Sequence, residues 1–122
     1  MVTSSQLPGG ADTIVALATA AGRGAVAVIR LSGARAIEIA RALGASDLQP
    51  RRATRVALRH PDGTPLDDTL VTWFAAPRSY TGDDVVEIST HGGQVAPSLV
   101  LAACVAAGAR PATPGEFTRR AV

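Results

Sequence analysis

Short apolar runs rich in valine and isoleucine recur along this chain, and each is bounded by residues that favour turns. The first two runs, residues 13–19 and 25–32, are separated by a segment with two glycines. Residues 53–60 alternate polar and apolar side chains, and a Pro-Asp-Gly turn joins them to a second strand-like run over 66–75. Period-two alternation between turn residues is typical of β-strands. The sequence therefore predicts a sheet that includes a hairpin over residues 53–75.

Two segments have helical patterns instead. Residues 34–43 place apolar side chains on one helical stripe, with Ser32 as the expected N-cap and Gly44 as the expected stop. An alanine-rich helix over about 94–107 follows a strand at 84–90 and ends at Gly108, after which residues 109–122 are expected to return at least partly as a strand.

The predicted order of elements is β-β-α-β-β-β-α-β, which indicates an α+β fold: a mixed β-sheet with two main helices on one face. A length of 122 residues suits one domain with its own core. Residues 1–11 are polar, rich in Ser, Gly and Pro, and show no periodicity, so we expect a disordered tail followed by a folded domain over 12–122.

Composition excludes several kinds of chemistry. All twelve basic residues are arginine, so this chain cannot supply a Schiff-base lysine or a P-loop lysine. The two histidines, the one cysteine and the short aspartate group match neither zinc-site spacing nor an EF-hand, and we expect no metal. Four arginines between 51 and 59 are interpreted as a solvated face, with RNA contact left open.

The single Cys104 lies in an alanine-rich run, where a small buried thiol is the expected role, and it cannot form an internal disulfide. The first residues lack the features of a signal peptide, and no apolar run reaches the roughly 20 residues of a membrane span. A cytoplasmic protein without membrane contact is therefore expected.

The segment SYTGDDVVEISTHGG, residues 79–93, places a carboxylate inside a valine-rich strand. Strand alternation puts Val86 and Ile88 on one face and Glu87 on the other. Glutamate is depleted in strands, and its valine neighbours favour partial burial beside a hydrogen-bond donor. Arg30, at the end of the strand over 25–32, is the candidate donor. A structural ion pair and a ligand site both predict proximity, and only a ligand site predicts a cavity.

The Gly92-Gly93 pair that follows has free backbone amides and could receive an anion at a helix start. A simple turn is the commoner role of such a pair. His91 is interpreted in the same way as a hydrogen-bonded surface histidine rather than a catalytic base.

Four segments, DTIVALAT, GRGAVAVIRLSG, SYTGDDVVEISTHGG and GARPATPGEFTRRA, occur in this order from Asp12 to the C-terminus. Together they resemble the N-terminal domain of the tRNA modification GTPase family called MnmE or TrmE. The resemblance implies a fold similar to the tetrahydrofolate-binding domains of aminomethyltransferases, a bound 5-formyl-tetrahydrofolate-type one-carbon donor, and a homodimer. The family's folate-contacting arginine and glutamate fall on Arg30 and Glu87. A carboxylate can accept paired hydrogen bonds from the N–H groups of the pterin, and a guanidinium can bind a ring oxygen or a tail carboxylate.

The resemblance also implies a longer parent protein, of which this chain is expected to be a non-catalytic part. That parent carries a GTP-binding domain that uses GTP, potassium and magnesium, and with its FAD-dependent partner, MnmG or GidA, it modifies C5 of the tRNA wobble uridine. In the family, a lysine in an Asn-Gly-Lys segment beyond this chain also touches the folate. The alternatives are a stand-alone RNA-binding or scaffolding domain and, less favoured, a piece of an aminomethyltransferase-like enzyme.

Overall fold

The structure is a computed structural model that describes residues 12–18, 22–93 and 95–121. The predicted tail over 1–11 lies outside these residues. The elements are β1 (Ile14–Leu17), β2 (Gly22–Ser32), α1 (Ala36–Ala42), β3 (Thr54–Arg59), β4 (Pro65–Phe74), β5 (Val85–Gly93), α2 (Val95–Ala106), β6 (Arg110–Pro111) and α3 (Glu116–Ala121).

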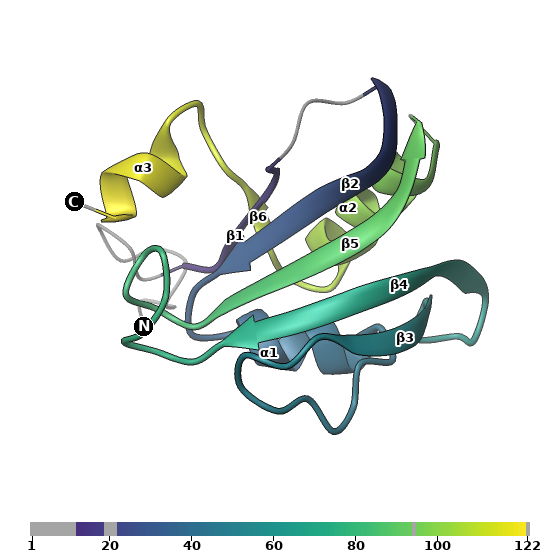
Figure 1. The fold of residues 1–122 in the computed structure, drawn as a ribbon, viewed down its shortest axis with the longest axis horizontal. Helices are drawn as coiled ribbons and strands as arrows, with labels where there is room; N and C mark the ends of the chain where they lie inside the picture. The colour runs from purple at the N-terminus through teal and green to yellow at the C-terminus, as the bar shows by residue number, and fades with distance from the viewer. Residues whose placement is uncertain (1–11, 19–21, 94, 122) are drawn as a thin grey trace, which may run out of the picture.

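A six-stranded sheet in the order β3-β4-β5-β2-β1-β6 organises the fold (Figure 1). All neighbours pair antiparallel except β1 and β6, which pair in parallel, so the sheet is mixed as predicted. The predicted hairpin is confirmed as β3 and β4, whose connecting turn has Gly63 at φ +94°. The long strands β2 and β5 lie at the centre of the sheet.

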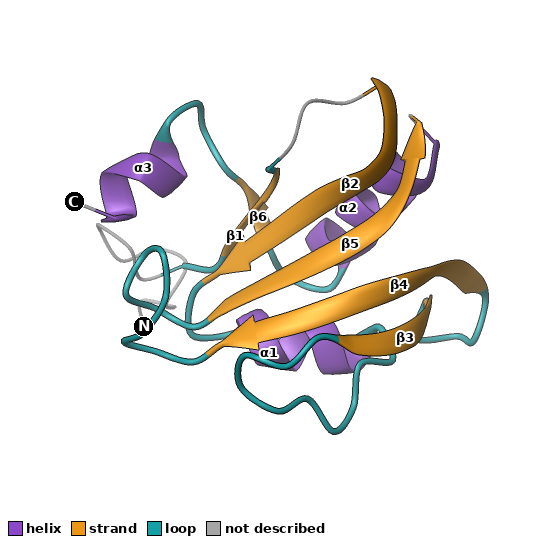
Figure 2. Ribbon diagram, viewed as in Figure 1, coloured by secondary structure: helices purple, strands orange, loops and turns teal. Residues whose placement is uncertain are grey.

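Helices α1 and α2 cover one face of the sheet, behind the strands in the view of Figure 2. Their buried residues pack on the strand side chains that point to that face, which confirms the predicted layering. The core consists of Val15, Ile29, Leu31, Ala36, Ile39, Ala40, Leu43, Ala45, Leu48, Val56, Leu58, Val71, Val86, Ile88, Val100, Ala103, Cys104 and Ala109. Burial of this apolar surface is the main force that holds the two layers together.

Helix α1 begins later than predicted and without the predicted cap. Its N-cap is Arg35, which makes no side-chain capping bond. Ser32 is still part of β2, and its hydroxyl contacts the Thr81 hydroxyl at 2.7 Å on the other side of the sheet. The Ser32 prediction was wrong because strand pairing with β5 extends through this residue. The predicted stop is confirmed, since Gly44 follows the helix with φ +101°.

Residues 109–122 are mostly not a strand. Strand β6 is only two residues long, and α3 follows it, so the sequence prediction missed a helix. The segment Thr113-Pro114-Gly115-Glu116 has capping-box spacing, and the Thr113 backbone N–H donates to Glu116 Oε1 at 2.9 Å. Proline after the cap is also typical of a helix start. This pattern was the available signal for α3.

Among the described residues, no helix has both the length and the apolar character that a membrane crossing requires.

Candidate functional site

Strand pairing places Arg30 and Glu87 directly opposite each other on β2 and β5. Ala16 on β1 and Thr72 on β4 continue the same row across the sheet. Because facing residues on neighbouring strands direct their side chains to the same face, both lie on the side away from α1 and α2. The two residues singled out from the sequence are therefore brought together.

The two side chains form a charge-assisted pair. Arg30 Nε and Nη2 donate to the same carboxylate oxygen, Glu87 Oε2, at 2.9 and 2.7 Å. The side chains are 27% and 29% exposed, which agrees with the partial burial expected from the valine neighbours. Within the described part of the chain, no group donates to the other oxygen, Oε1. A pair with one uncommitted oxygen can still accept hydrogen bonds from a ligand.

Two aromatic rings flank the guanidinium of Arg30. Its Cζ lies 5.2 Å from the centroid of the Tyr80 ring and 6.0 Å from that of Phe117. Tyr80 comes from the loop before β5 and Phe117 from α3, and the Tyr80 hydroxyl contacts the Thr118 hydroxyl at 3.3 Å. Contacts of this kind attract a cation to the ring face and limit its movement. Arg30 is thus held by an acid and two rings.

Two open hollows are lined by neighbours of this arginine, one by Glu87 and Tyr80 and the other by Phe117. The larger has a volume of about 570 Å³, and we call it the Glu87 hollow; its lining residues are Arg51, Phe74, Pro77, Arg78, Ser79, Tyr80, Val85 and Glu87. The smaller, of about 340 Å³, is lined by the β1 end, the 112–115 loop and the start of α3, with Phe117 among its walls. Small-molecule sites commonly measure roughly 300–1,000 Å³. An open hollow of this size is therefore present beside Glu87.

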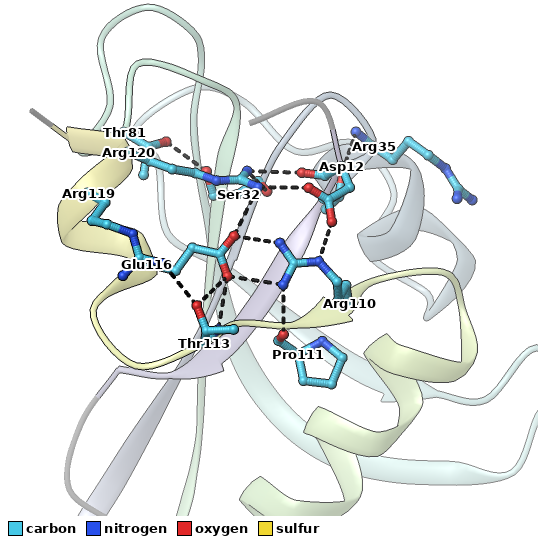
Figure 3. Close-up of polar contacts among 11 residues, drawn as sticks. Asp12, Ser32, Arg35, Thr81, Arg110, Pro111, Thr113, Glu116, Arg119 and Arg120 are labelled. Atoms are coloured by element: carbon cyan, nitrogen blue, oxygen red, sulfur yellow. Dashed lines mark hydrogen bonds and ion pairs between the residues drawn. The ribbon is translucent and has the colours of Figure 1, made fainter. Parts of the chain in front are cut away.

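A cluster of ion pairs attaches α3 to the rest of the fold (Figure 3). Arg110, on β6, pairs with Asp12 and with Glu116, and Arg120 pairs with Asp12 at 2.9 Å. The Arg120 side chain is 8% exposed and also donates to the Asp12 backbone oxygen at 2.9 Å. We call these four residues the α3 clasp. By fixing the helix, the clasp holds Phe117 next to Arg30.

The clasp changes the acidity of its members. Its hydrogen bonds from Arg110 lower the pKa of Glu116 to about 2 and also lower the pKa of Asp12, against the opposing effect of burial. The hydrogen bonds to Glu116 and Asp12 raise the pKa of Arg110 in turn. These shifts keep Asp12, Glu116 and Arg110 in their charged forms at neutral pH.

The Gly92-Gly93 pair does not form a turn. Both residues belong to β5, and Gly93 pairs with Gly22 of β2. His91 Nδ1 contacts Asp67 Oδ1 at 2.7 Å, and the histidine side chain is 70% exposed. The interpretation of His91 as a hydrogen-bonded surface residue is confirmed, and the glycines extend the strand rather than interrupt it.

Cys104 is fully buried in α2, as predicted. Burial raises the pKa of its thiol to about 12, so the thiolate that a nucleophile or metal ligand requires is absent at neutral pH. Within the described residues, no group of three or more His, Cys, Asp or Glu side chains is arranged to hold a metal ion.

Three residues of the site were not identified from the sequence. The sequence predicted no functional role for Tyr80 or Phe117, and Arg51 was assigned to a solvated face. In the structure Arg51 Cζ lies 5.5 Å from the centroid of the Phe74 ring, inside the Glu87 hollow. Their positions depend on the folding of two loops and α3, for which the sequence has no periodic signal.

Comparison with known proteins agrees with the resemblance of the four segments. Residues 13–122 match the family model described as the N-terminus of the GTP-binding protein TrmE. The chain is 51% identical over 113 residues to a protein of Akkermansia muciniphila, with 89% of this chain and 25% of the relative aligned. It is 47% identical over 118 residues to a protein of an Azoarcus species, with 97% and 26% aligned.

A third relative, from Xanthomonas campestris, is 48% identical over 110 residues, with 90% of this chain and 25% of the relative aligned. All three relatives are named tRNA modification GTPase MnmE, and the chain spans about a quarter of their length. The family match covers all but the first twelve residues. The chain therefore belongs to the TrmE N-terminal domain family, found at the start of the tRNA modification GTPases called MnmE.

Proposed function

We propose that this chain is the folate-binding and dimerisation module of a tRNA modification GTPase, and that it binds a 5-formyl-tetrahydrofolate-type one-carbon donor. The relatives' names support the tRNA modification part of this proposal. The observation that carries the folate part is the Glu87 carboxylate, which lies at the wall of a 570 Å³ hollow with one oxygen bound by Arg30 and one uncommitted.

This geometry suits a pterin. The 2-amino group and the neighbouring ring N–H of a pterin are adjacent donors, and a carboxylate at the hollow wall can accept from them as an anion that is already neutralised by Arg30. The Tyr80 ring lines the same hollow and offers an apolar surface for a planar heterocycle. Arg30 would hold the carboxylate in this orientation and remain available to a ring oxygen.

The chemistry of the parent would take place elsewhere. The chain contains no lysine, so a P-loop for GTP, with its potassium and magnesium, would belong to another part of the protein. The module would present the one-carbon unit, as a homodimer, to the reaction at C5 of the tRNA wobble uridine that the parent and its FAD-dependent partner perform. On its own it would catalyse nothing.

Calorimetric titration of 5-formyl-tetrahydrofolate into the chain tests the proposal. We expect saturable binding to the wild type and at least tenfold weaker binding to Glu87→Gln, because the amide turns one acceptor oxygen into a donor that faces the pterin donors. Glu38→Gln is the matched control, since Glu38 is exposed on α1 and pairs only with Arg35. Thermal unfolding of each variant shows that it is folded.

The same titration is repeated with a longer version of the chain that includes the family's Asn-Gly-Lys segment. This version contains the lysine that is expected to contact the folate. Absence of saturable heat in both versions would disprove folate binding, and so would equal affinities of Glu87→Gln and Glu38→Gln. An RNA gel shift that salt weakens and that Arg55→Gln with Arg59→Gln abolishes would favour the RNA-binding alternative instead.

A further inference from the structure

The Glu87 hollow is electrically asymmetric. Its one acidic wall residue, Glu87, is paired with Arg30, whereas Arg51 and Arg78 line the same hollow as cations. Among the described residues, neither of these two arginines forms an ion pair with a carboxylate. Asp84, an acid of the neighbouring loop, accepts instead from the Ala76 N–H at 2.9 Å. Two guanidiniums without an acid partner at one rim favour an anionic group of a ligand.

Arg51 is held toward this hollow by its surroundings. Its backbone N–H donates to the Trp73 oxygen at 2.7 Å, and its φ of +63° is uncommon for a residue other than glycine. Its guanidinium lies over the Phe74 ring and donates through Nη2 to the Arg78 backbone oxygen at 3.2 Å. A residue kept in a sparsely populated backbone conformation, with an oriented charge, is a frequent feature of ligand-binding sites. The arginine is thus oriented before any ligand binds.

The spacing across the hollow suits an elongated ligand. Glu87 lies on β5, and the segment with Arg51 lies along the far side of β4, bridged to it at Trp73. Two inter-strand spacings separate the two backbones by about 10 Å. A folate carries donors on its pterin at one end and carboxylates on its glutamate tail at the other, so a single ligand could contact both Glu87 and the arginines of the same hollow.

We propose that Arg51 and Arg78 form a subsite for the carboxylates of the ligand's glutamate tail, so that the module prefers folates with more than one glutamate. This inference rests on the proposed folate binding and adds a specificity determinant to it. It also assigns the tail to these two residues, which leaves Arg30 to hold Glu87 and to contact a ring oxygen of the pterin.

The test compares three ligands by calorimetry: 5-formyl-tetrahydrofolate, its triglutamate form and the corresponding tetrahydropteroate, which has no glutamate. For the wild type we expect affinity to rise from the tail-free ligand to the triglutamate, and to fall with added salt. The double variant Arg51→Gln with Arg78→Gln should bind the triglutamate roughly tenfold more weakly, because two exposed charge-assisted contacts are lost. Its affinity for the tail-free ligand should equal that of the wild type.

Arg52→Gln is the matched control, because Arg52 is an exposed neighbour that does not line the hollow. The single variant Arg78→Gln keeps the hydrogen bond from Arg51 Nη2 to the backbone oxygen of residue 78. It therefore remains informative if changing Arg51 disturbs folding. Equal affinity of the wild type for all three ligands, or an equal loss for the tail-free ligand in the double variant, would overturn the subsite while folate binding stands. A wild type that binds none of the ligands contradicts the proposed function itself.

Discussion

Gly33 is a backbone position at which three segments of the chain meet at close range. It follows β2 with φ +144°, a backbone conformation that residues other than glycine rarely adopt. Its N–H donates to the Asp84 backbone oxygen at 2.9 Å. A Cβ built on it would lie 2.6 Å from the Thr13 Cα, which is backbone and cannot move aside cheaply. Gly33 therefore brings the end of β2 close to Thr13, just before β1, and to Asp84, just before β5.

We expect Gly33→Ala to lower the free energy of unfolding by about 2–4 kcal/mol, since it combines backbone strain with a steric overlap. Urea denaturation measures the change. Gly63→Ala is the control: it also has positive φ, but nothing lies within 4 Å of its added Cβ, so we expect a loss of only about 1 kcal/mol. Equal losses in the two variants would show that the close approach at Thr13 is unimportant.

At the scale of elements, α3 is too short to be stable alone and depends on its attachment. None of its residues is fully buried, so the α3 clasp rather than an apolar face fixes it. Glu116 is central, because it pairs with Arg110 and also accepts from the Thr113 backbone. Docking of the helix, and with it the position of Phe117 beside Arg30, is therefore expected to depend on pH.

The direction of this pH dependence follows from the pKa of Glu116, which is about 2 in the folded protein and 4.5 as its ordinary value. A lowered pKa stabilises the fold above about pH 4.5, and this contribution is lost as the pH falls toward 2. Because Arg110 is partly exposed, we expect the ionised Glu116 to contribute about 1–2 kcal/mol to the free energy of unfolding at pH 7. Glu116→Gln should lose this amount at pH 7, as measured by urea denaturation.

The difference between Glu116→Gln and the wild type should shrink as the pH is lowered from 5 to 2. Glu38→Gln, which removes an exposed pair on α1, should change stability by less than about 0.5 kcal/mol. Hydrogen exchange of the α3 amides reports whether the loss is local to the helix. A difference between Glu116→Gln and the wild type that stays constant over the pH range would contradict the role of the ionised clasp.

At the scale of the whole molecule, one core connects the sheet with α1 and α2. Strands distant in sequence, such as β2 and β5, pair at its centre, so the layers cannot separate without exposing the shared apolar surface. A chain of this length with a single core is expected to unfold cooperatively. The site residues Arg30 and Glu87 belong to these central strands and share their stability.

We expect unfolding in urea to give the same midpoint by two probes: the fluorescence of Trp73, the only tryptophan, on β4, and far-ultraviolet circular dichroism of the whole chain. Glu87→Gln should keep the two midpoints coincident, because the pair lies on the open face rather than in the core. Separate midpoints would show that the β3–β4 hairpin unfolds independently of the rest.

Much of the fold follows from local patterns. Period-two alternation located the strands and put Glu87 on the face opposite to Val86 and Ile88, and helical spacing with Gly44 and Gly108 located α1 and α2. The α+β class with two helices on one face followed from the order of these elements. These features were predictable because each depends on residues within about one helical turn or a few strand positions.

The surroundings of the Arg30–Glu87 pair were decided by tertiary structure. Helix α3 forms where attachment through Arg110 stabilises a segment with weak helical preference, and Ser32 remains in β2 because pairing with β5 outweighs a capping role. The Glu87 hollow exists only because the segment at Arg51 and the loop with Tyr80 fold beside β4 and β5. Such contacts join residues far apart in the chain, and no periodic pattern records them, whereas alternation and helical spacing act between near neighbours and are written directly in the sequence.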